Sequence, residues 1–86
     1  MTRYDIEISE TAEKQLKKLQ RGDQRRVVRA IVALADEPHP RGSRKLSGYN
    51  DVFRIRVGRY RVIYSVSGNR LIVIILKIGH RKDVYR

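Results

Sequence analysis

Arginine alternates with apolar side chains between Phe53 and Tyr64 (FRIRVGRYRVIY), and this pattern restricts the fold more than any other feature of the chain. Successive side chains of a β-strand point to opposite faces of a sheet. The pattern therefore predicts two strands joined near Gly58, with Ile55 and its apolar neighbours directed into a core.

The same alternation places Arg54 and Arg56 together on the other face, and the next strand adds Arg61 beside them. Guanidinium groups packed this closely repel one another, so a fold gains little stability from the arrangement. We therefore expect an anion to offset the repulsion. This face is the predicted working surface of the protein.

Helix-forming segments precede the hairpin. A first strand is expected over residues 3–8, and Ser9 is the expected N-cap of a first helix. The break at residues 21–23 predicts a second helix, capped by Asp23 and ended at residues 36–38. Both helices carry apolar side chains at helical spacing. These side chains are Ala12, Leu16 and Leu19 in the first helix and Val27, Ala30, Ile31 and Leu34 in the second.

The second half of the chain predicts a sheet. Residues 39–50 are rich in Pro, Gly and Ser and are expected to form a loop. Strands over residues 52–57, 60–66 and 70–78 are joined by short turns, and the last is apolar on both faces and expected inside the sheet. The fold class is α+β, a single domain over residues 1–86. It has an N-terminal strand, a helical hairpin and a three-stranded antiparallel meander (βααβββ), with the sheet packed on the helix pair.

The charge balance points to a polyanionic partner. Lys and Arg total 20 against 9 acidic residues, which gives a net charge of +11 in 86 residues. Such a field attracts RNA, DNA, an acidic membrane surface or an acidic protein. The chain has no cysteine, which suits a reducing cytosol and excludes a disulfide framework and a thiolate metal site. No apolar run is long enough to span a bilayer, so a cytoplasmic protein with no membrane partner is expected.

Several site types are excluded by their missing motifs. The sequence has neither a phosphate-binding GxxxxGK[ST] loop nor HExxH, and only two histidines, so neither a metal nor a cofactor is expected. The planar arginine fork donates two parallel hydrogen bonds to phosphate, and aromatic rings can hold an unstacked base. Single-stranded RNA fits better than duplex DNA, because no recognition helix accompanies the basic stretch.

Three motifs carry a family resemblance: KLSG before the sheet, RIRVGRYRVIY within it, and GHRKDVYR at the end. Together they resemble the RelE family of bacterial and archaeal toxins, in chain length and element order as well. The resemblance implies a ribosome-dependent endoribonuclease that cleaves messenger RNA in the ribosomal A site and so inhibits translation. It also implies contacts with ribosomal RNA, an acidic RelB-like antitoxin as partner in a type II toxin–antitoxin system, and metal-independent attack by the substrate's own 2′-hydroxyl.

The catalytic positions of the family fall on five residues: Arg54, Arg56, Arg61, Arg81 and Tyr85. By resemblance, Tyr85 is the general base and Arg81 helps to protonate or stabilise the leaving oxygen, of which stabilisation is favoured because arginine is a poor proton donor. Better-known members carry lysine at the positions of Arg54 and Arg56, and arginine keeps the charge but cannot give up a proton. His80 is the alternative base, because its ordinary pKa lies near neutrality. RNA-binding residues are expected at Lys45, Arg59 and Lys82.

Two other functions remain open. A ParE-like gyrase inhibitor belongs to the same superfamily and needs none of these arginines for chemistry. A non-catalytic RNA- or ribosome-binding module also fits the charge. Because the fold is shared, the function has to be argued from the site, and the presence of all five positions favours RelE.

Overall fold

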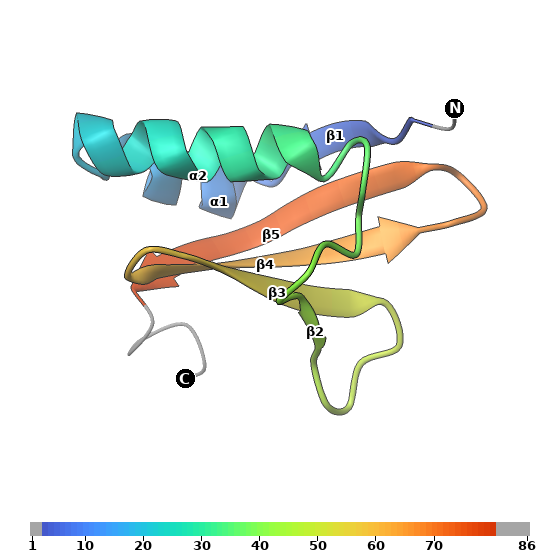
Figure 1. The fold of residues 1–86 in the computed structure, drawn as a ribbon. Helices are drawn as coiled ribbons and strands as arrows, with labels where there is room; N and C mark the ends of the chain where they lie inside the picture. The colour runs from blue at the N-terminus through green and yellow to red at the C-terminus, as the bar shows by residue number, and fades with distance from the viewer. Residues whose placement is uncertain (1–2, 81–86) are drawn as a thin grey trace.

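Two helices lie across one face of a five-stranded mixed sheet in the computed structural model, which describes residues 3–80 (Figure 1). The elements in chain order are β1 (Asp5–Ile8), α1 (Glu10–Lys17), α2 (Arg21–Ala33), β2 (Arg44–Lys45), β3 (Val52–Val57), β4 (Tyr60–Ser67) and β5 (Ile72–His80). The order across the sheet is β1-β5-β4-β3-β2. The predicted α+β class and the packing of the sheet on the helix pair are confirmed. Neither of these helices is long and apolar enough to cross a membrane.

The antiparallel meander of the C-terminal half is formed by β3, β4 and β5, as predicted. The β3–β4 turn closes at Gly58, whose φ of 60° is a conformation that glycine adopts without strain. Strand β1 pairs in parallel with β5, so that Asp5 lies opposite Ile72. The prediction that the strand apolar on both faces lies inside the sheet is confirmed, since β5 has a neighbour on each side.

Helix α1 begins as the sequence predicts. The Ser9 hydroxyl accepts a hydrogen bond from the amide of Ala12 (3.1 Å) and donates one to the carbonyl of Leu76 (3.0 Å). The first bond caps the helix and the second ties its start to β5. A further tie is made by the side chain of Gln15, whose Oε1 accepts from the amide of Ile78 at 2.7 Å.

The predicted cap of the second helix is wrong. Helix α2 already begins at Arg21, and Gln20 occupies the N-cap position with an extended backbone and no side-chain cap. Asp23 therefore lies within the first turn, where its carboxylate still complements the positive end of the helix dipole. Helix α1 ends at Lys17, earlier than predicted, and α2 ends at Ala33.

The prediction that residues 39–50 form only a loop is also wrong. The two residues of β2 pair with β3, Arg44 opposite Arg54 and Lys45 opposite Phe53. A two-residue strand has no visible alternation, and only its partner makes it extended. The sheet therefore gains a strand that the predicted βααβββ order lacks, and β5 runs from residue 72 to 80 rather than from 70 to 78.

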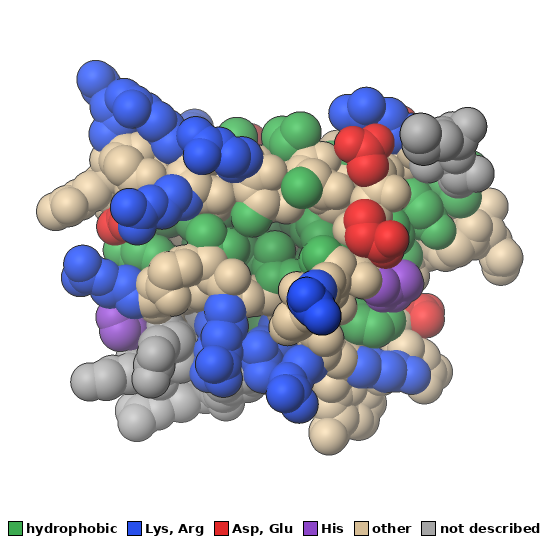
Figure 2. Space-filling view, in the orientation of Figure 1, with side chains coloured by type: hydrophobic (Ala, Val, Ile, Leu, Met, Phe, Trp, Pro, Cys, Tyr) green, Lys and Arg blue, Asp and Glu red, His purple; other side chains and the backbone are tan. Residues whose placement is uncertain are grey.

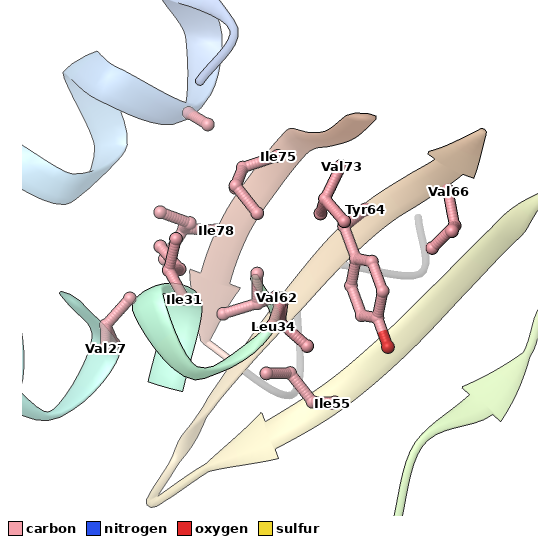
Figure 3. Close-up of a cluster of buried hydrophobic side chains, with 11 residues drawn as sticks. Val27, Ile31, Leu34, Ile55, Val62, Tyr64, Val66, Val73, Ile75 and Ile78 are labelled. Atoms are coloured by element: carbon pink, nitrogen blue, oxygen red, sulfur yellow. The ribbon is translucent and has the colours of Figure 1, made fainter. Parts of the chain in front are cut away.

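The core lies between the two helices and the sheet (Figure 3), and α1 contributes the buried Ala12 to it. Val27 and Ile31 of α2 and its C-cap residue Leu34 point toward the strands, as their spacing predicts, and all three are buried. They meet side chains from three strands of the meander. These are Ile55 from β3, Val62, Tyr64 and Val66 from β4, and Val73, Ile75 and Ile78 from β5. The face of the sheet that carries Ile55 and Val62 is therefore the helix side.

Tyr64 anchors the connection between α2 and β2. Its ring is fully buried, and its hydroxyl donates to the carbonyl of Pro38 at 2.8 Å. Burial raises the pKa of Tyr64 to about 12. The ring also stacks on Phe53 (6.0 Å between centroids), and the ring of His39 meets Phe53 edge-on at 4.6 Å. These contacts fix the start of the segment that leads to β2.

Candidate functional site

Three arginines share the face of the sheet that no helix of the described chain covers. The register places Arg56 directly opposite Arg61, and Arg54 is two residues from Arg56 on the same strand. Directly paired residues of an antiparallel ladder lie on one face, as do residues i and i+2 of a strand. Arg44 joins them, because it lies opposite Arg54. We call these four residues the arginine face.

Figure 2 shows basic side chains gathered over the β2–β3 end of the sheet, with others along the helices. Three ion pairs within residues 3–80 lie away from this face. They join Arg3 to Asp36, Lys14 to Glu10 and Lys17 to Glu13. No His, Asp or Glu side chains of this range gather in a group of three that could hold a metal ion. The arginine face is therefore positive, and no group of three acidic side chains from residues 3–80 lies beside it.

Arg54 is the most unusual member of this face. Only 9% of its surface is exposed, yet no hydrogen bond or ion pair to its guanidinium is found in the described part of the chain. Burying most of an arginine that has no counter-ion within residues 3–80 raises the free energy of the fold. Arg44 and Arg56 add repulsion to this cost. The arrangement is suited to an anion that is bound from outside.

A hollow of about 310 Å³ opens between the arginine face and the segment before β2. It is lined by Arg41, Gly42, Arg44, Arg54, Ile55 and Arg56. The sequence singles out Arg54 and Arg56 but gives no signal for Arg41 or Arg44. Both lie in the stretch that composition predicts as a loop, and only the pairing of β2 with β3 brings them to this surface.

The predicted RNA-binding residues lie at different places. Lys45 is exposed in β2 and borders a neighbouring hollow of about 380 Å³, which Arg44 and Arg54 also line. Arg59 is exposed in the β3–β4 turn, next to the end of the Arg56–Arg61 pair. The predicted site residues Arg81, Lys82 and Tyr85 lie outside the described residues.

His80 is not brought to the arginine face. It ends β5 opposite Tyr60, and the two rings meet edge-on with centroids 6.0 Å apart. The hydroxyl of Tyr60 donates to a carboxylate oxygen of Asp23 on α2 at 3.3 Å, and its ring packs against the core. His80 therefore shares the helix side of the sheet with Tyr60.

The sequence matches a known toxin family over most of its length. The profile described as "ParE toxin of type II toxin-antitoxin system, parDE" matches residues 6–85. "Putative toxin RelE1" of Methanocaldococcus jannaschii is 31% identical, over 98% of this chain and 97% of the relative. "Toxin RelG" of Mycobacterium tuberculosis is 33% identical, over 96% of this chain and 97% of the relative.

Solved structures share the fold. A chain in the crystal structure of an archaeal RelE–RelB complex from Pyrococcus horikoshii superposes with a TM-score of 0.84 at 36% identity. The match covers 98% of this chain and 100% of that one. A chain of the RelBE2 toxin–antitoxin complex from Mycobacterium tuberculosis gives a TM-score of 0.81 at 30% identity, over 92% and 99% of the two chains. The predicted RelE-like fold and the family resemblance are confirmed. The chain is a RelE-like toxin that belongs to the ParE toxin family of type II toxin–antitoxin systems.

Proposed function

We propose that this toxin is a metal-independent endoribonuclease that cleaves messenger RNA in the ribosomal A site, in the cytoplasm, and so stops translation. One observation carries the proposal. Arg54 is almost buried and has no acidic partner in the described chain, while Arg56 and Arg61 share its face. A guanidinium group held this way is ready to bind a phosphate, because the packing of the arginine stem already limits the freedom of the side chain and directs its charge to the hollow.

The proposed reaction is a transesterification within the RNA. The 2′-oxygen attacks the adjacent phosphorus as its proton passes to a base, and the bond from phosphorus to the 5′-oxygen breaks. The leaving oxygen takes up a proton, so the products are a cyclic 2′,3′-phosphate and a 5′-hydroxyl end. Negative charge gathers on the non-bridging oxygens in the transition state. Fixed guanidinium groups stabilise that charge most.

Each arginine then has a role. Arg61, with Arg54 or Arg56, binds the non-bridging oxygens of the scissile phosphate. Arg81 stabilises the leaving oxygen and Tyr85 removes the proton, roles that come from the family resemblance. The position of His80 on the helix side favours Tyr85 over His80 as the base.

The partners of this site follow from its charge. Lys45, Arg59 and Lys82 are proposed to contact the RNA backbone, and other basic side chains to contact ribosomal RNA. A toxin of net charge +11 also suits an acidic, RelB-like antitoxin. The structural neighbours that are RelE–RelB complexes support such a partner.

The test is cleavage of a defined messenger RNA on programmed ribosomes with an empty A site. The wild-type toxin is expected to cut within the A-site codon, and Arg61→Ala to slow cleavage by about 10²–10³-fold, which is typical of a lost transition-state donor. Arg25→Ala is the matched control, because it removes an equal charge from the exposed surface of α2. Intact messenger RNA with the wild type, or equal loss in both variants, would overturn the proposal.

A second candidate is inhibition of gyrase, which the description of the matching family as a ParE toxin favours. Growth arrest would then bring DNA breaks and an SOS response, and the toxin would inhibit purified gyrase. Cleaved messenger RNA without these signs favours the nuclease. A non-catalytic RNA- or ribosome-binding module would bind ribosomes and lose binding in Arg61→Ala, but would never release a cleaved product.

A further inference from the structure

The short strand β2 adds an arginine, Arg44, that the proposed chemistry does not use. Arg44 lies directly opposite Arg54, while Arg61 lies opposite Arg56 on the other edge of β3. With strands about 4.8 Å apart and a rise of about 3.4 Å per residue, the backbones at Arg44 and Arg61 are about 12 Å apart. The arginine face therefore offers two anion positions along β3 rather than one.

The second position is a shaped hollow. Arg41, Arg44, Arg54 and Arg56 line it, and its volume of about 310 Å³ is at the lower end of the range for ligand pockets. None of its lining residues is acidic, and within residues 3–80 none of these four arginines takes part in an ion pair. Four positive charges around one hollow select an anion.

The rim of this hollow is held in place. The chain bends at Gly42, whose φ is 92°, and Ser43 donates its amide to the carbonyl of Pro40 at 3.0 Å. Upstream, the hydroxyl of Tyr64 binds the carbonyl of Pro38. Arg41 thus projects from a segment that is fixed at both ends, which lowers the entropic cost of binding.

We infer that the hollow formed by Arg41, Arg44, Arg54 and Arg56 binds a second phosphate of the same RNA strand, flanking the scissile one. The inference rests on the proposed function, since it needs RNA on the arginine face. Arg54 and Arg56 border both positions, so two phosphates of one strand are held along β3. The flanking phosphate fixes the path of the strand and places the reactive 2′-hydroxyl in line with the phosphorus.

Uncleavable RNA tests this directly. The probe is a short single-stranded oligonucleotide with 2′-O-methyl riboses, in which one phosphate at a time is replaced by a neutral methylphosphonate. Dissociation constants are measured by fluorescence anisotropy for the wild type, for Arg41→Ala/Arg44→Ala and for Arg25→Ala/Arg29→Ala. The last pair removes the same charge from α2 and is the matched control. Arg41→Gln/Arg44→Gln repeats the test if the alanine pair does not fold.

In the wild type, neutralising one particular phosphate is expected to weaken binding by about tenfold. In the Arg41/Arg44 variant the same replacement has no effect, while the other phosphates still respond. The salt dependence of log affinity also becomes shallower, by about 0.7 per lost phosphate contact. The control variant keeps the response of the wild type to that phosphate.

The inference is overturned if the wild type does not bind the probe, or if both double variants change binding equally at every phosphate. Its failure can be told from failure of the proposed function. If the wild type cleaves messenger RNA on ribosomes but shows no phosphate-specific response, only the second phosphate-binding position is ruled out. If the wild type shows a phosphate-specific response but does not cleave, the hollow binds RNA as proposed and the nuclease function is ruled out.

Discussion

Replacing Arg54 by methionine is expected to stabilise the fold and to slow the proposed cleavage. Arg54 is 9% exposed and has like charges on two sides, Arg44 across the strands and Arg56 along β3. At about 8 Å and an effective dielectric constant of about 40, each pair repels by about 1 kcal/mol. Screening at physiological salt removes more than half of this repulsion. Removing the charge of a mostly buried side chain further increases the free energy of unfolding.

The expected net gain is about 1–2 kcal/mol in the free energy of unfolding, because methionine keeps the length of the apolar stem and loses only the charge. For a chain of this size, each kcal/mol raises Tm by about 4–8 °C. Thermal unfolding is followed by circular dichroism at low and high salt. The difference between Arg54→Met and the wild type is expected to shrink as salt screens the repulsion.

Arg25→Met on α2 is the control, since an exposed substitution changes stability by no more than about 0.5 kcal/mol. The reasoning is refuted if Arg54→Met is less stable than the wild type by about 1 kcal/mol or more. The Arg54 guanidinium would then be a structural group rather than one that is kept for an anion.

Three other predictions concern single residues. Tyr64→Phe is expected to cost about 1–3 kcal/mol in urea unfolding, because it leaves the buried carbonyl of Pro38 without its donor. The pKa of Tyr64 is about 12 in the fold against about 10 in the unfolded chain, so its contribution is complete below pH 10 and is lost as pH rises through 12. The stability difference between wild type and Tyr64→Phe is therefore expected to narrow above pH 10, and a constant difference would show that the hydroxyl does not titrate this way. Arg81→Ala and Tyr85→Phe are each expected to abolish growth arrest but to keep antitoxin binding in a pull-down, and full toxicity of both would remove their catalytic roles. His80→Ala is expected to keep cleavage within about threefold of the wild type on programmed ribosomes, and a loss of 10² or more would make His80 the base.

The strands of the central hairpin were predictable because apolar and basic side chains alternate in them with a period of two residues. The alternation from Phe53 to Tyr64 is long enough to assign each side chain to a face, and the structure places Arg54, Arg56 and Arg61 together. The Ser9 cap was predictable for a similar reason, because its hydrogen bond is local in sequence.

Other features depend on tertiary contacts that leave no local pattern. Arg44 is extended only because β3 pairs with it. Arg41 lines the same hollow as Arg44 because the chain bends directly after Arg41. Asp23 has the chemistry of a cap, but α2 begins two residues before it. The face of His80 was not predictable either, since β5 runs two residues beyond the predicted end and pairs His80 with Tyr60.

Sugar chemistry at the cut site tests the central claim most directly. Ribosomes are programmed with a messenger RNA that carries a single 2′-deoxy sugar at the nucleotide cut in the all-ribose message, and the products are resolved after incubation with the toxin. If the arginine face holds a phosphate while the RNA's own 2′-hydroxyl attacks it, the all-ribose message ends in a cyclic phosphate and the deoxy message stays whole at that position. Cleavage of the deoxy message at the same bond, or no cleavage of either message, would contradict the account.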